Sequence, residues 1–240
     1  MFSALVKAVE QTLDPAFRKV FVKSLLLSLV TFVILWVGTG FVFSDNSGFI
    51  ESFMPSWLAD WMPDWIYALT GVALVVFVSF ILFPAVMIAV MAFFLEDIAS
   101  AVERKHYPVR TAGREQPVAE VLISALQFLG LTLAVNLLAL PFYIMAIFIP
   151  GLSLVLYYLI NGYLFGREYF EMIALRRMGH GEMKMNHSKL SGPAFRTGML
   201  GAFLFTIPLV NLLTPLWMTA VMLHRYEGWR EQGKLTESQS

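Results

Sequence analysis

The sequence feature that most constrains the fold is a long apolar run from Phe195 to Leu223, interrupted by Pro208 and Pro215. A helix that spans a bilayer needs about 20 apolar residues, so this run is too long for one span and too short for two. Each proline removes a backbone donor and disfavours helix just before it. The run therefore predicts a helical hairpin with arms of roughly 14 residues, about 21 Å long at 1.5 Å per residue. Arms of that length do not cross a hydrocarbon core of about 30 Å, so we expect the hairpin to enter the membrane only partway.

The tip of this hairpin, 208–215, is expected at membrane depth, where it places Asn211 between the two prolines. Irregular backbone at that depth must face protein or water. A second run, 118–166, is divided by Pro150 and Gly151 and predicts another hairpin. Broken helices in membranes recur where ions or substrates are handled. Packing proteins share the pattern, so both interpretations stay open. The candidate path residues are Pro150, Gly151, Pro208, Asn211 and Pro215.

The composition places the chain among membrane proteins. Of its 240 residues 58% are hydrophobic and only 14% are charged, whereas soluble domains have about 25% charged residues. The fold class predicted is an all-α polytopic membrane protein with two long transmembrane helices, two half-spanning hairpins and amphipathic interfacial helices. The net charge of zero gives no reason to expect a nucleic-acid partner.

The remaining segments are assigned in chain order. Residues 1–13 form an amphipathic helix, 20–43 and 66–93 are full spans, and 224–240 is a polar tail expected to fray. The 178–192 segment between the interfacial helix 167–177 and the last hairpin is expected to be a loop. The whole of 1–240 is treated as a single membrane domain.

The topology follows from the basic residues. Lys and Arg precede the first span, follow the second, separate the hairpins and end the chain, whereas the 44–65 loop has acidic residues and no Lys or Arg. The positive-inside rule then places both termini and all basic loops in the cytoplasm and the 44–65 loop outside it.

Residues that could perform catalysis are few. The chain has no Cys, no HExxH, no GxSxG and no phosphate-binding Gly loop. Its four histidines, His106, His180, His187 and His224, lie in or next to polar segments and are expected to be solvent-exposed; their spacing fits no defined metal site. Glu168 and Glu171 are interpreted as a solvated helix face. We therefore expect no enzyme, no metal and no cofactor.

Two stretches carry a resemblance to a known family. They are FIPGLSLVLYYLINGYLFGREYFEMIALRR, which starts at Phe148, and TIPLVNLLTPLWMTA, which starts at Thr206. With the layout of most of the chain, they resemble the CysZ/EI24 family of bacterial inner-membrane proteins. The resemblance implies two long transmembrane helices and two helix pairs that penetrate halfway, and it implies a link to sulfate uptake for cysteine synthesis.

The resemblance also implies an anion site. Family sulfate permeases have paired arginines before the first span, and this chain has Arg18 and Lys19 there. The family has a Gly-Leu stretch after the second span, where this chain has Phe94 to Asp97. Its two carboxylates, Glu96 and Asp97, would repel sulfate unless they are paired.

The function expected from the resemblance is a sulfate permease or sulfate-related anion channel in the bacterial inner membrane. The alternative is a non-transporting membrane scaffold or assembly protein. Sulfate or a related small anion and the lipid bilayer are the expected partners. Half-spanning arms leave surface that one protomer does not cover, so a homo-oligomer is expected.

Overall fold

The computed structural model describes residues 2–44, 64–109, 113 and 117–236, and within them it is helical with no strand. The predicted fold class, an all-α polytopic membrane protein, is confirmed. The chain divides into two compact units, which are described separately: Lys19–Phe93, and Met1–Arg18 together with Phe94–Ser240. Two stretches in the described helices, Pro15–Val37 and Leu126–Ala146, are long and apolar enough to cross a membrane.

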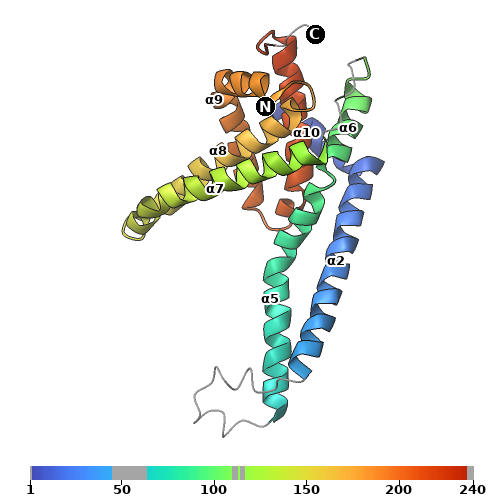
Figure 1. Ribbon diagram of the computed structural model, residues 1–240, viewed down its shortest axis with the longest axis vertical. Coiled ribbons are helices and arrows are strands. Elements are labelled where there is room, and N and C mark those ends of the chain that lie inside the picture. Colours follow the sequence, from blue (N-terminus) through green and yellow to red (C-terminus); the bar gives the residue numbers. More distant parts are fainter. Residues whose placement is uncertain (1, 45–63, 110–112, 114–116, 237–240) are drawn as a thin grey trace. The chain divides into compact units, whose positions relative to one another are not determined.

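The Lys19–Phe93 unit is a pair of long helices. They are α2 (Pro15–Ser44), whose first residues belong to the other unit, and α5 (Asp64–Ala92), and they run side by side in Figure 1. Pro15 opens α2, where its fixed φ suits the first helical position. The rings of Phe32 and Phe83 lie 5.8 Å apart, and the indole N–H of Trp36 donates to Ser79 at 2.7 Å. These helices cover the expected span 20–43 and residues 66–92 of the expected span 66–93. Most of the acidic 44–65 loop lies outside the described residues.

The other unit holds the remaining helices. In chain order they are α1 (Phe2–Glu10), the 3-10 turn η1 (Gln11–Leu13), α6 (Leu95–His106), α7 (Val118–Ala146), α8 (Leu152–Ala174), α9 (His180–Phe205) and α10 (Val210–Glu231). α10 is buried along almost its whole second half, and α1, α6, α8 and α9 all pack on it. It is therefore the central element of this unit.

α8 and α9 form the most extensive helix pair in the described structure. Their backbones meet at Gly162 and Gly166 on α8 and Gly198 on α9. A Cβ added at Gly198 would lie 1.9 Å from the Gly162 carbonyl oxygen, and one added at Gly166 would lie 2.5 Å from the Ala194 oxygen. Small residues at four-residue spacing permit such close approach of two helices in a membrane.

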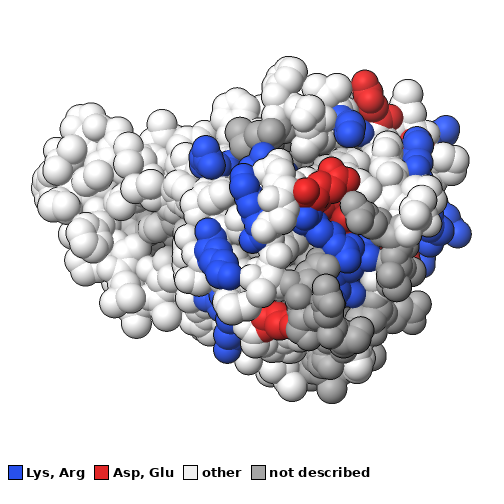
Figure 2. All heavy atoms as spheres, turned by 90° about the horizontal axis from the view of Figure 1, so that it is seen from above, with Lys and Arg blue, Asp and Glu red and all other residues white. Residues whose placement is uncertain are grey.

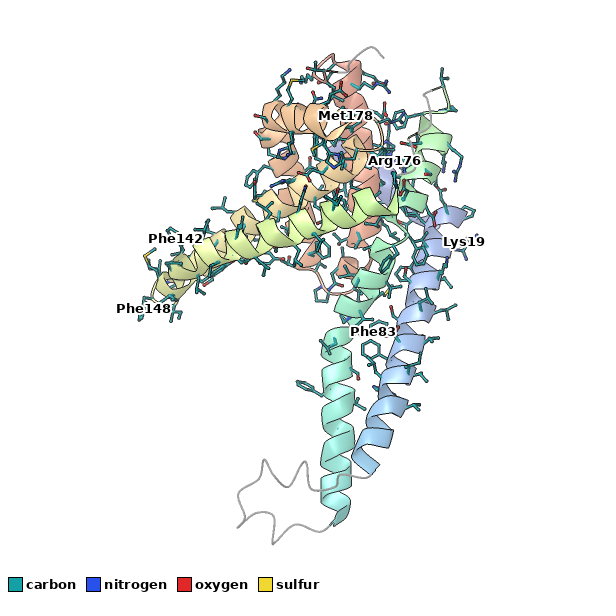
Figure 3. All side chains as sticks on the ribbon, viewed as in Figure 1. Lys19, Phe83, Phe142, Phe148, Arg176 and Met178 are labelled. Atoms are coloured by element: carbon teal, nitrogen blue, oxygen red, sulfur yellow. The ribbon has the colours of Figure 1, made fainter. Side chains whose placement is uncertain are left out.

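The arm formed by α7 and the first part of α8 is apolar and exposed. Phe142 and Phe148 lie near its far end in Figure 3 and are more than half exposed. The arm is uncharged in Figure 2, whereas Lys and Arg side chains gather over other parts of that face. Gly151 turns the chain between the helices with φ 83°, a conformation that favours glycine. A surface of this kind suits contact with lipid or with another apolar surface.

Four expected boundaries differ from the structure. The interfacial helix expected at 167–177 is not a separate element, because α8 continues without a break as far as Ala174. The 178–192 segment is not a loop, because α9 begins at His180 and buries Met183 and Leu190. The tip between α9 and α10 spans only 206–209, because Pro215 lies inside α10 rather than at the end of an irregular tip. The 224–240 tail is helical as far as Glu231. In each case burial against neighbouring helices stabilises helix where the local sequence alone does not favour it.

The backbone contact at Gly198 generates a stability prediction. Gly198→Ala should lower the melting temperature in detergent, because overpacking costs about 1–3 kcal/mol and here the obstacle is backbone. Gly192→Ala is the matched control, since it lies on the same helix with no heavy atom within 4 Å of the added Cβ. The control should melt at the wild-type temperature or higher, because alanine favours helix. Equal melting temperatures of the two variants would show that the α8 and α9 backbones are not in close contact at Gly198.

Candidate functional site

The most highly charged buried cluster in the described structure centres on Arg176, which follows the end of α8. Its guanidinium donates to Glu96 Oε1 at 2.6 Å, to Glu103 Oε2 at 2.8 Å and to Ser100 Oγ at 3.0 Å. The three acceptors lie at four- and three-residue spacing on α6, which places them on one helix face. The side chain of Arg176 is only 4% exposed (Figure 3 labels it).

Arg177 extends this ion network to α10. It donates to Glu103 Oε1 at 3.1 Å and to Glu227 Oε1 at 3.2 Å, and Arg230 lies 3.9 Å from Glu227 Oε2. Glu103 therefore bridges both arginines, one through each carboxylate oxygen. The side chain of Glu103 is 7% exposed and that of Glu227 is fully buried.

Gly113 covers one side of the network. Its backbone N–H donates to Glu103 Oε2 at 3.4 Å, and a Cβ at this position would lie 2.9 Å from Arg176 Nε. As arranged, Arg176 is committed to three protein acceptors. The network thus joins α6, α8 and α10, and Arg176 is not an open anion site.

A second polar cluster joins η1 to α6 and α10. The Gln11 side-chain amide donates to His106 Nε2 at 2.6 Å and to His224 Nε2 at 3.2 Å, and His224 Nδ1 lies 2.8 Å from the Tyr107 hydroxyl. Gln11 Oε1 is buried without a hydrogen-bond partner in the part of the chain that the structure describes.

Burial affects the charge of these histidines. It is the largest cause that lowers the pKa of His224 to about 4, and the neighbouring His106 and Lys7 lower it further. The pKa of His106 is lowered as well, first by burial and then by Lys105 and Lys7, against a smaller opposite effect of Asp14. The expectation that all four histidines are solvent-exposed is therefore wrong for His224, which is buried at the packed side of α10.

The segment just before the predicted anion residues is held by side chains. Besides Gln11, the indole N–H of Trp217 donates to Thr12 Oγ1 at 2.8 Å, and Lys105 Nζ donates to both carboxylate oxygens of Asp14 at 2.7 and 2.8 Å. Four residues after Asp14, Arg18 is exposed near the start of α2, and Lys19 next to it is exposed too (Figure 3). Within the described residues, neither side chain forms an ion pair or hydrogen bond with another side chain.

The structure does not bring the predicted path residues together with Arg18. Pro150 and Gly151 form the exposed turn between α7 and α8, and Pro208 is exposed in the turn between α9 and α10. Asn211 lies in the first turn of α10 with its backbone N–H bonded to Ile207, and Pro215 is buried inside the same helix.

Sequence reasoning missed the ion network. It expected Glu96 and Asp97 to repel an anion unless they are paired. Glu96 is paired with Arg176, whereas Asp97 is exposed without such a pair in the described residues. The available signal was the Arg176–Arg177 pair placed directly after an apolar helix face. Glu171 is not simply solvated either, because Arg167 Nε donates to it at 2.5 Å. No group of three or more His, Asp or Glu side chains in the described residues is arranged to hold a metal ion.

Comparison with known protein families identifies the family of this chain. Residues 4–215 match the family described as sulfate transporter CysZ/etoposide-induced protein 2.4. The chain belongs to this CysZ/EI24 family. The match runs from α1 to Pro215 inside α10 and so includes Arg18, Lys19, the ion-network residues on α6 and α8, and both hairpin turns. The description of this family names a sulfate transporter. No curated protein matches the chain.

The ion network predicts a sharp stability loss on neutralising its bridging carboxylate. Glu103→Gln leaves two buried arginines short of a charge partner, and breaking a buried pair costs about 3–5 kcal/mol. The variant should therefore melt well below wild type in detergent. Arg104→Gln, at an exposed position next to it on α6, should melt like wild type. A Glu103→Gln melting temperature equal to that control would show that the network does not stabilise the fold.

The histidine cluster predicts a pH-dependent stability. His224 has an ordinary pKa of about 6.5 when unfolded and about 4 when folded. Between those values the unfolded chain binds more protons, so the stability present above pH 6.5 falls as the pH drops toward 4. His224→Gln should reduce the decrease in melting temperature between pH 7.5 and pH 5, whereas His180→Gln at the start of α9 should not. If the melting temperature of wild type and of His224→Gln fell equally between pH 7.5 and pH 5, His224 would not be the source of the pH dependence.

Proposed function

We propose that the chain is a bacterial inner-membrane sulfate permease or related anion channel that supports sulfate uptake for cysteine biosynthesis. The observation that carries the proposal is the pair of exposed cations at Arg18 and Lys19, which have no side-chain partner among the described residues and lie within the family match. Cations without a carboxylate partner near a helix start favour anion binding, because the free amides and the helix dipole act in the same direction.

Two carboxylates that could oppose an anion are paired with cations of the protein. Asp14 precedes α2 by one residue, but its charge is paired with Lys105. Glu96 is paired with Arg176. An anion near Arg18 and Lys19 would thus meet less opposing charge than the sequence suggests. Of Asp14, Glu96 and Asp97, only Asp97 is exposed and has no ion pair among the described residues.

The mechanism proposed is passive conduction. Basic residues on the cytoplasmic side concentrate anions, and the hairpin turns at Gly151 and Pro208 line or support a path through the membrane. Both termini lie in the cytoplasm under this proposal, as the basic loops predict. The exposed apolar arm of α7 and α8 favours a homo-oligomer, because a second protomer would cover part of it.

The proposal is tested by neutralising the two cations. In Arg18→Gln/Lys19→Gln, sulfate affinity in detergent should fall at least about tenfold, the equivalent of about 1.4 kcal/mol, because a charge-assisted contact to the anion is lost. Sulfate flux into liposomes should fall with it. Lys7→Gln, which removes an exposed cation from α1, is the matched control and should bind sulfate as wild type does.

Asp97→Asn provides the converse measurement and should tighten sulfate binding by removing an exposed negative charge. Equal sulfate affinities in wild type and the double variant, or no measurable binding by either, would overturn the transport proposal. That result would favour the scaffold alternative, in which Arg18 and Lys19 set topology and contact lipid phosphates.

A further inference from the structure

A small cavity of about 150 Å³ lies between α8 and α9. It is lined by Tyr163, Arg167 and Glu171 from α8 and by Met183, Lys184 and His187 from α9. Sites for drug-sized ligands start at about 300 Å³, so this cavity suits a single small group. None of its lining residues belongs to the ion network or to the Gln11–histidine cluster.

The charges of the lining leave one positive charge in excess. Arg167 Nε donates to Glu171 Oε1 at 2.5 Å, so these two charges offset each other. Lys184 is exposed and has no ion pair in the part of the chain that the structure describes. Burial lowers the pKa of His187 below its ordinary 6.5, so its imidazole contributes a neutral hydrogen-bonding group at pH 7. Two cations and one carboxylate match a ligand group with one negative charge and several acceptor oxygens.

An apolar ridge leads to the cavity along α8. Val155, Leu159 and Tyr163 are 52%, 48% and 40% exposed, and Arg167 follows after the same four-residue step. Residues four apart form a continuous ridge on a helix surface. From Val155 to Arg167 the ridge rises about 18 Å at 1.5 Å per residue. Tyr163 belongs to both the ridge and the cavity wall, so the two surfaces are continuous.

We propose that this cavity binds the phosphodiester group of an anionic membrane phospholipid, with one acyl chain along the ridge formed by Val155, Leu159 and Tyr163. A phosphodiester carries the single negative charge that the lining matches, and the acyl chain accounts for the exposed apolar ridge next to a cationic cavity. Lys184 is the main charged contact, because its ammonium has no protein partner among the described residues. The proposal does not depend on sulfate conduction.

The test uses the full chain in detergent, titrated with dioctanoyl phosphatidylglycerol and followed by native mass spectrometry. Lys184→Gln should weaken lipid binding about tenfold, which corresponds to about 1.4 kcal/mol. Lys189→Gln is the matched control on the same helix, since Lys189 donates to Thr236 at 2.7 Å and does not line the cavity. It should bind the lipid as wild type does. Equal binding by both variants would overturn the proposal.

A second variant separates the lipid from a free oxyanion. Leu159→Ser interrupts the ridge without changing any cavity residue, so it should weaken lipid binding and leave the binding of inorganic phosphate unchanged. The lipid proposal would be overturned if Leu159→Ser left lipid binding unaffected and inorganic phosphate displaced the lipid. That result would assign the cavity to a free oxyanion. Arg18→Gln/Lys19→Gln should leave lipid binding unchanged, which distinguishes failure here from failure of the sulfate proposal.

Discussion

Charges buried among helices must be paired, and in this chain the pairing of Glu103 with two arginines determines how several helices meet. A lone carboxylate or guanidinium in that position would carry a desolvation cost of several kcal/mol. Glu103 presents one oxygen to Arg176 and the other to Arg177, and Arg177 continues to Glu227. The pairs thus fix α6, the end of α8 and α10 relative to one another. Such a network favours this arrangement of the helices, since a packing that separated Glu103 from the two arginines would leave buried charges unpaired.

Close helix packing adds a second constraint. Gly162, Gly166 and Gly198 bring the backbones of α8 and α9 into contact, where larger side chains would separate them. Further along the same pair, Arg167 and Lys184 border a cavity instead. One helix pair therefore provides both a tight contact and an open, cationic site, and the difference is set by side-chain size at a few positions.

The paired carboxylates also affect the proposed transport function. Pairing of Asp14 with Lys105 and of Glu96 with Arg176 offsets negative charge on the segments that flank the start of α2. Arg18 and Lys19 then remain as cations without side-chain partners among the described residues. The description of the matched family names a sulfate transporter, and this charge distribution agrees with the anion site that we propose.

The sequence by itself determined the fold class, because its 58% hydrophobic residues include several long apolar runs, and a helix satisfies its own backbone hydrogen bonds within the bilayer. It also determined the family, through the Pro-tipped hairpins around Pro150 and Pro208. Only the tertiary structure decided the helix at 180–192, the burial of His224 and the partners of Glu96 and Glu103. Local propensity is weaker than packing between distant segments, and a pair such as Arg176 and Glu103 is separated by more than seventy residues. Whether a charge in the sequence is solvated or buried depends on which helix faces it, and that is set by the fold as a whole.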